Sequence, residues 1–217
     1  MERRLREKDE IIDTFQSLSK RIGSGKMVWR YDPIIFDDLH DVEYHKEQFL
    51  RLCDRLHSCT ERVVISYLDL YKKQRKGIFR EAYPEEIAAL SGFIGETAGA
   101  YGLSVSACCE KTDLRKYGIT PAGCIDRTLL EKVCGVPLSV PKDRNQRSGC
   151  GCCESIDIGA YNTCGNGCLY CYATEEERAA RYVCDPQSAI LDGLDTGRCK
   201  ITERKVISYS DMMRKKL

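Results

Sequence analysis

Arg62-Val63-Val64-Ile65-Ser66-Tyr67 is the stretch of the sequence that decides the fold class. Its β-branched and aromatic residues predict a strand. A helical pattern precedes it over residues 42–58, with Asp41 as the expected N-cap. Another helix follows it and begins at Pro84, a residue that suits the first helical turn. A strand between two helices is the repeating unit of a parallel sheet with crossover connections.

The same alternation continues on both sides of this unit. The helix from Pro84 is expected to stop at Gly102. We expect further helices over residues 5–22 and 127–134, and further strands over residues 103–108 and over residues 26–33, which Pro33 closes. Residues 137–155 have no regular pattern. A last strand is expected over residues 155–161, followed by a cysteine-rich loop and a helix over residues 174–183. The sequence therefore predicts an α/β fold with a parallel sheet.

The number of expected strands is too small for a closed barrel. A (β/α)8 barrel has eight strands and about 250 residues, whereas this chain has 217 residues and a pattern for only about half as many strands. It also begins on a helix, as though a preceding strand were missing. We therefore expect a partial, barrel-like sheet in an N-terminally truncated chain. It forms a single domain over residues 1–217, with βα units over 1–136, a cysteine-rich cluster-binding region over 137–183 and a tail over 184–217.

The composition is that of an ordinary globular protein. Hydrophobic residues make up 42 % of the chain, charged residues 31 %, and the net charge is +1. This balance gives no reason to expect a nucleic-acid partner. The sequence contains no apolar run of about 18 residues, so no membrane span is expected, and the charged N-terminus does not resemble a signal peptide. We expect a cytoplasmic protein.

The cysteines carry most of the functional information. There are 14, and Cys150, Cys152, Cys153, Cys164, Cys168 and Cys171 fall within a short stretch. Clustered cysteines in a chain without an export signal favour metal binding over a disulfide framework.

Cys164, Cys168 and Cys171 form a C-x3-C-x2-C loop, in which Tyr170 precedes the last cysteine. Three thiolates cap three irons of a [4Fe-4S] cluster and leave the fourth iron open. A zinc site is the alternative, and it would need a fourth ligand from outside the loop. The odd number of thiols and their spacing favour an iron–sulfur cluster.

A second group of thiols is less regular. Two of the cysteines at residues 150–153 could combine with Cys124 and with Cys108 or Cys109. The resulting set, Cys108, Cys124, Cys150 and Cys152, could hold an auxiliary cluster or a zinc ion. The alternative is that these are small buried residues with no ligand.

Polar residues also recur where the predicted strands end. Arg30, Asp32, Ser66 and Glu110 all occupy such positions. Functional groups of parallel sheets collect at the carboxyl ends of the strands, so we take these four as candidate contacts to a cofactor or substrate. A simple ion pair between Arg30 and Asp32 is the alternative. His45 is expected to be a core or surface residue with no functional role.

Several segments together resemble an uncharacterised prokaryotic family of domains of unknown function whose C-terminal cysteines are similar to the cluster site of radical S-adenosylmethionine (SAM) enzymes. They are residues 29–34, 44–45, 64–67, 108–110, 123–126, 142–147 and 155–164. The resemblance runs from Lys26 to Ala173. It implies a radical SAM barrel in which the cluster loop lies near the C-terminus, as in a circular permutation, and further N-terminal units that this chain lacks.

The same resemblance implies a function. Cys164, Cys168 and Cys171 would hold a [4Fe-4S] cluster, with Tyr170 beside it, and SAM would bind at the open iron and be cleaved reductively to act on an unknown substrate. An electron donor such as a ferredoxin or flavodoxin would be the partner. A non-catalytic zinc- or cluster-binding protein and a cluster carrier are the alternatives.

Overall fold

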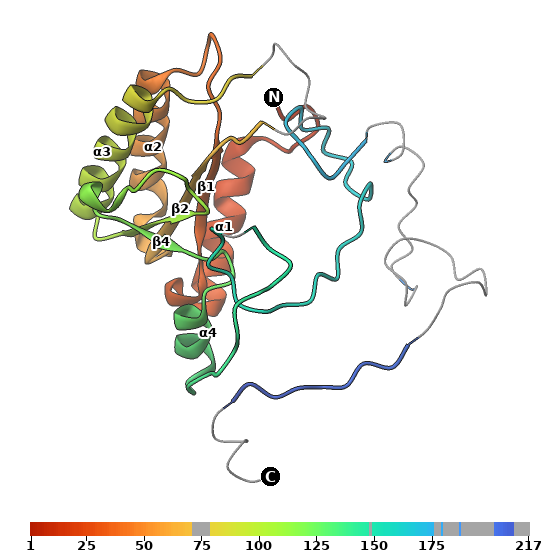
Figure 1. Cartoon of the computed structure of the whole chain (residues 1–217). Helices are drawn as coiled ribbons and strands as arrows, with labels where there is room; N and C mark the ends of the chain where they lie inside the picture. Colours follow the sequence, from red (N-terminus) through yellow and green to blue (C-terminus); the bar gives the residue numbers. More distant parts are fainter. Residues whose placement is uncertain (71–78, 148, 176–178, 180–186, 188–201, 211–217) are drawn as a thin grey trace. The chain divides into compact units, whose positions relative to one another are not determined.

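The computed structural model describes residues 1–70, 79–147, 149–175, 179, 187 and 202–210 (Figure 1). The chain divides into two compact units. The first consists of Met1–Arg6, Tyr71–Arg75 and Ile156–Ser208, and the second of Glu7–Leu70, Lys76–Ser155 and Tyr209–Leu217. The second unit contains the sheet, and the first contains the C-x3-C-x2-C loop.

The sheet has four strands in the order β1-β2-β3-β4: β1 (Trp29–Ile34), β2 (Arg62–Tyr67), β3 (Ser104–Cys108) and β4 (Ile119–Ala122). All three pairings are parallel. The predicted α/β class and parallel sheet are therefore confirmed. The sheet is open, since β1 and β4 pair with only one neighbour each.

The structure describes four α-helices: α1 (Lys8–Ile22), α2 (Val42–Leu56), α3 (Pro84–Ala100) and the short α4 (Arg127–Cys134). The first three contribute buried residues to the core, whereas α4 contributes none. Phe49 of α2 and Leu90 and Ile94 of α3 are completely buried in one cluster with Val63 and Ile65 of β2. Figure 1 shows α2 and α3 running side by side against the sheet. Within the described residues, we find no helix with both the length and the apolar character to cross a bilayer.

Local sequence signals set the ends of these helices. The Asp41 carboxylate accepts a hydrogen bond of 2.8 Å from the backbone N–H of Tyr44, which confirms Asp41 as the N-cap of α2. At the start of α3, Glu86 accepts a bond of 2.8 Å from the N–H of Tyr83. α1 ends at Gly23, whose φ of 92° suits a glycine. It begins at Lys8 rather than at residue 5.

The strand predicted over residues 155–161 is wrong. The structure gives these residues no strand, and Ile156 and Ile158 are 58 % and 84 % exposed. The physical reason is local: the Asp157 carboxylate accepts a bond of 2.7 Å from the N–H of Gly159. Such a turn competes with strand pairing for the backbone.

The sequence did not predict β4. Pro121 lies within it and argues against a strand, but β4 is an edge strand, where a missing N–H is tolerated. Pro33 likewise does not close β1, which continues to Ile34 past a cis Asp32–Pro33 bond and a shift in register. Most of the helix predicted over residues 174–183 and most of the predicted tail lie outside the described residues.

The two faces of the sheet differ in character. Trp29, Val63, Val105 and Ile119 are register partners across all four strands, and all belong to the helix-covered core. Successive side chains of a strand alternate between faces. The next row, Arg30, Val64, Ser106 and Thr120, therefore points to the opposite face. Cys108, two residues after Ser106, lies on this second face as well.

Gly95 of α3 gives a test of the packing. A Cβ there would lie 1.9 Å from the backbone oxygen of Tyr117, whereas a Cβ at Gly99 of the same helix meets nothing within 4 Å. We expect Gly95→Ala to lower the free energy of unfolding by about 1–3 kcal/mol through the clash. Gly99→Ala should instead raise it by about 0.5–1 kcal/mol, since alanine favours the helix. Urea unfolding of both variants measures the difference, and equal effects would contradict this packing.

Candidate functional site

Side chains from three strands meet beside the carboxyl ends of β3 and β4. Arg30 is the second residue of β1, so the prediction that it lies at the end of a strand is wrong. Arg30 Nε donates to Asp32 Oδ1 over 3.1 Å, so the two residues of β1 form the ion pair considered from the sequence. The Arg30 guanidinium also hydrogen-bonds the thiol of Cys124, just beyond β4. The Cys124 sulfur lies 2.8 Å from that of Cys108, the last residue of β3. The parallel register brings Cys108 and Cys124 together, because it places the ends of β3 and β4 at one edge, and the long Arg30 side chain reaches Cys124 from within β1.

These contacts favour a thiolate at Cys124. The hydrogen bond with Cys108 and that from Arg30 outweigh the effect of burial and lower the pKa of Cys124 to about 5. The same sulfur–sulfur contact, with burial, raises the pKa of Cys108. The pair therefore shares one negative charge, held at Cys124 by the neighbouring cation.

A second loop carries Cys150 and Cys152 to the same place. A Cβ on Gly123 would lie 2.6 Å from the backbone nitrogen of Cys152, so the two loops approach as closely as only glycine allows. The N–H of Cys153 donates to the Ile125 oxygen over 3.0 Å and fixes this approach. The N–H of Ile125 points at the Cys152 sulfur over 3.5 Å.

The sulfurs of this second loop interact with the first pair. Burial, the contact with Cys150 and the charge of Cys124 raise the pKa of Cys152 to about 11. The charges of Cys150 and Cys152 also contribute to the raised pKa of Cys108. The structure thus brings together the four predicted residues of the second metal site. Cys153 is directed elsewhere, because its sulfur accepts from the backbone of Arg127.

Glu110, two residues beyond the end of β3, has a raised pKa. Its Oε1 accepts a bond of 2.8 Å from the N–H of Tyr67, at the end of β2. Burial raises the pKa of Glu110 to about 7, against the effect of that bond. Asp69 nearby is paired with Arg147 over 2.5 Å and with Lys111 over 3.1 Å. Ser66 is half-buried on β2.

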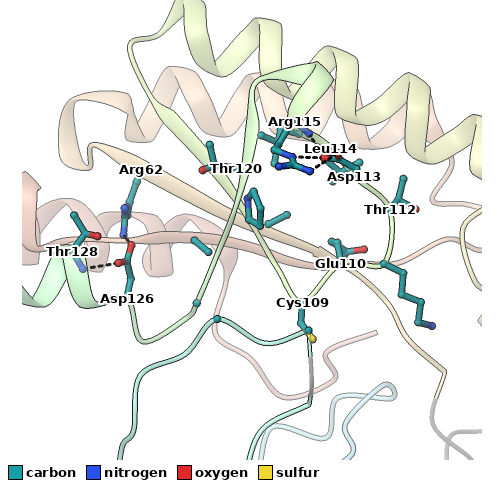
Figure 2. Close-up of a pocket in the computed structure, with 18 of the residues that line it drawn as sticks. Arg62, Cys109, Glu110, Thr112, Asp113, Leu114, Arg115, Thr120, Asp126 and Thr128 are labelled. Carbon is teal, nitrogen blue, oxygen red and sulfur yellow. Dashed lines mark hydrogen bonds and ion pairs between the residues drawn. The ribbon is translucent and has the colours of Figure 1, made fainter. Parts of the chain in front are cut away.

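A pocket of about 700 Å³ opens beside β4 (Figure 2). Figure 2 shows Arg62, Asp126 and Thr128 at one end of it and Cys109 and Glu110 at the other. Arg62 pairs with Asp126 over 2.8 Å, and Asp126 also caps α4 through the N–H of Thr128. This end of the pocket is therefore organised by an ion pair. Sequence patterns could not predict the pocket, since its wall is the unpredicted strand β4.

The C-x3-C-x2-C loop lies in the first unit and is held by the N-terminal residues. Glu2 pairs with Cys168 as an isolated antiparallel bridge. The N–H of Leu169 donates to the Met1 oxygen over 3.1 Å, and that of Arg4 to the Asn166 oxygen over 3.0 Å. These backbone bonds join residues about 160 positions apart in sequence, and nothing in the spacing of the cysteines predicted them.

The three thiols of this loop are free and close enough to influence one another. Cys164 is exposed, and Cys168 and Cys171 are partly buried. Burial and the charge of Glu2 raise the pKa of Cys168, with further contributions from Cys171 and Cys164. The N–H of Cys171 bonds the Cys168 oxygen over 3.1 Å, which closes a turn between the two.

Tyr170, predicted to flank a cofactor, has a structural partner. Its hydroxyl donates to Glu2 Oε1 over 2.6 Å and so joins the loop to the N-terminal strand-like segment. His45 is a satisfied core residue, as expected: one ring nitrogen lies 2.9 Å from the Tyr31 hydroxyl and the other 2.9 Å from the Ile35 oxygen.

In the described part of the chain, no three His, Cys, Asp or Glu side chains are already arranged so that they could hold a metal ion. In the loop cysteines and in the second set of four cysteines, the side chains are therefore not in the arrangement of a metal-bound site. Their donor chemistry, free thiols on adjoining backbone, is that of zinc and iron–sulfur ligands.

The raised pKa of Glu110 gives a test with a defined sign. The unfolded carboxyl loses its proton near pH 4.5 and the folded one near pH 7, so the carboxylate destabilises the fold increasingly across this interval. We expect Glu110→Gln to be more stable than the wild type at pH 8, by about 1–3 kcal/mol, and equal to it near pH 4.5. Chemical unfolding at both pH values measures this, with Glu96→Gln, an exposed carboxyl on α3, as the control. A pH-independent difference would contradict the burial of Glu110.

Comparisons with known proteins give one match. Residues 1–173 match the family described as a domain of unknown function, DUF1848. No curated protein and no solved structure matches the chain. The match covers most of the 217 residues and agrees with the family expected from the sequence. The chain therefore belongs to the DUF1848 family.

Proposed function

We propose that the chain binds a [4Fe-4S] cluster through Cys164, Cys168 and Cys171 and acts as an enzyme of the radical SAM type. The observation that carries this proposal is the C-x3-C-x2-C spacing of three free thiols within one loop. A cubane with three protein ligands keeps one iron open for a cofactor.

The donor set of the loop fits such a cluster. The Cys168 thiol is within electrostatic reach of both Cys164 and Cys171. Gly167 has a φ of 66°, a conformation that glycine adopts without strain and that bends the chain directly before Cys168. A turn then brings Cys171 back toward Cys168. Among the described residues these side chains do not already surround one centre, so binding of the cluster would reorient them.

The residues around the loop would position it and limit access of water. The backbone bonds from Met1 and Arg4 hold residues 166–169, and the Tyr170 ring stands beside Cys168 with its hydroxyl on Glu2. Packing and hydrogen bonding around cluster sulfurs tune the potential of a cluster. When bound, a cluster of this type supplies the electron for reductive cleavage of SAM.

The four-stranded sheet is compatible with part of a (β/α) barrel, and we propose that the chain is built on such a partial barrel. Among the four polar candidates predicted from the sequence, Arg30 and Asp32 pair with each other, and Arg30 also contacts Cys124. Glu110 can exchange a proton near neutral pH, so it is our first candidate for contact with a substrate, and Ser66 the second. A ferredoxin or flavodoxin would serve as the electron donor.

Removal of one loop thiol tests the cluster. After anaerobic reconstitution of the full chain with iron and sulfide, we expect about four irons per chain and the broad visible absorption of a cubane. Cys168→Ala should lose most of the iron, because one iron loses its only protein ligand. Cys134→Ala is the matched control, since Cys134 is an exposed free thiol at the end of α4, and its iron content should equal that of the wild type.

The same samples test the reaction. Reduction with dithionite in the presence of SAM should release 5′-deoxyadenosine from the wild type and the Cys134→Ala variant but not from Cys168→Ala. A colourless protein, or iron content that Cys168→Ala leaves unchanged, would refute the ligand assignment. A reducible cluster that never cleaves SAM would instead leave an electron carrier as the function.

A further inference from the structure

We propose that Cys108, Cys124, Cys150 and Cys152 form a second, separate site for a single zinc ion bound by four thiolates. This site belongs to the second unit and uses none of the loop cysteines, so it stands or falls independently of the cluster proposed above.

Two of the four ligands are brought together by the sheet itself. Cys108 ends β3, and its register partner is Ala122, two residues before Cys124. The two sulfurs lie 2.8 Å apart. In a tetrahedral zinc site with bonds of about 2.3 Å, two sulfurs are about 3.8 Å apart. An opening of about 1 Å, within reach of a small side-chain rotation, separates the observed pair from that geometry.

The other two ligands come from a loop whose backbone is fixed against the first pair. Gly123 and Gly151 let the two loops touch, and the N–H of Cys153 bonds the Ile125 oxygen over 3.0 Å. Cys150 and Cys152 are only 5 % and 6 % exposed, yet both are free thiols whose side chains contact each other. A fixed backbone that carries free thiols lets a metal ion gather its ligands with little further ordering of the chain.

The surroundings suit bound thiolates. The N–H of Ile125 lies 3.5 Å from the Cys152 sulfur, and hydrogen bonds of this kind stabilise metal-bound sulfur. Four thiolates leave a zinc ion with surplus negative charge, and the Arg30 guanidinium beside Cys124 offsets part of it. Asp32 holds Arg30 in this position.

The short distances favour a single ion over a cluster. A cubane places each cysteine on a different iron, so its sulfurs stand farther apart than the ligands of one ion. The contact of Cys108 with Cys124 is too close for that arrangement. The alternative of buried, ligand-free cysteines accounts poorly for Cys124, which is exposed.

Zinc content of the full-length chain tests the site. Elemental mass spectrometry should find about one zinc per chain in the wild type. We expect at least a fivefold loss in Cys124→Ser, a change at an exposed position, and in Cys152→Ser. Cys134→Ser, another exposed thiol, should keep the wild-type zinc. Cys168→Ala should keep zinc while it loses iron, which separates this site from the loop.

A second measurement keeps the test decisive if a variant misfolds. X-ray absorption at the zinc edge of the wild type should show four sulfur neighbours at about 2.3 Å, and fewer sulfurs would overturn the assignment. Equal zinc in Cys124→Ser and Cys134→Ser would also overturn it. Peptide maps of the wild type purified under reducing conditions give a third check. A Cys108–Cys124 disulfide there would overturn the assignment, because a disulfide cannot supply two thiolates.

Discussion

The parallel register of the four strands is the constraint on which the rest of the second unit depends. It places Trp29, Val63, Val105 and Ile119 in one row under the helices. The same alternation sends the neighbouring row to the other face, and the common direction of the strands brings their polar ends to one edge. The contact of Cys108 with Cys124 follows from the meeting of the strand ends, and Arg30 lies on the second face because it belongs to the neighbouring row.

Opposing effects act on the ionisation of the thiols at this edge. Burial and mutual proximity disfavour thiolates at Cys108 and Cys152, whereas Arg30 favours one at Cys124. A cluster of thiols packed this closely has a cost in repulsion whenever more than one is ionised. A cation bound among them would remove that repulsion. The geometry and the charges of these thiols therefore both favour the proposed zinc site.

The sequence predicted much of the fold because its signals are local. The strand over residues 62–67, the N-cap Asp41 and the helix from Pro84 depend on side-chain period and capping chemistry, and the structure agrees with each. β4 could not be predicted, because only its edge position makes Pro121 acceptable. The strand expected over residues 155–161 failed because a turn at Asp157 takes its place. The grouping of Cys108 with Cys124 was proposed only from their shared thiol chemistry, and the end of β4 that brings them together was not predicted. The hydrogen bond between Tyr170 and Glu2 joins residues far apart in sequence, so no local pattern could predict it.

The backbone pairing of the first residues with the cysteine loop has a consequence for biosynthesis. Arg4 bonds Gly165 and Asn166, which lie about 160 residues further along the chain. These bonds can form only after both segments have been synthesised, and closing so long a stretch carries an entropic cost. Until then the thiols of the loop lack this support, so the proposed cluster would be assembled only after both segments have been translated.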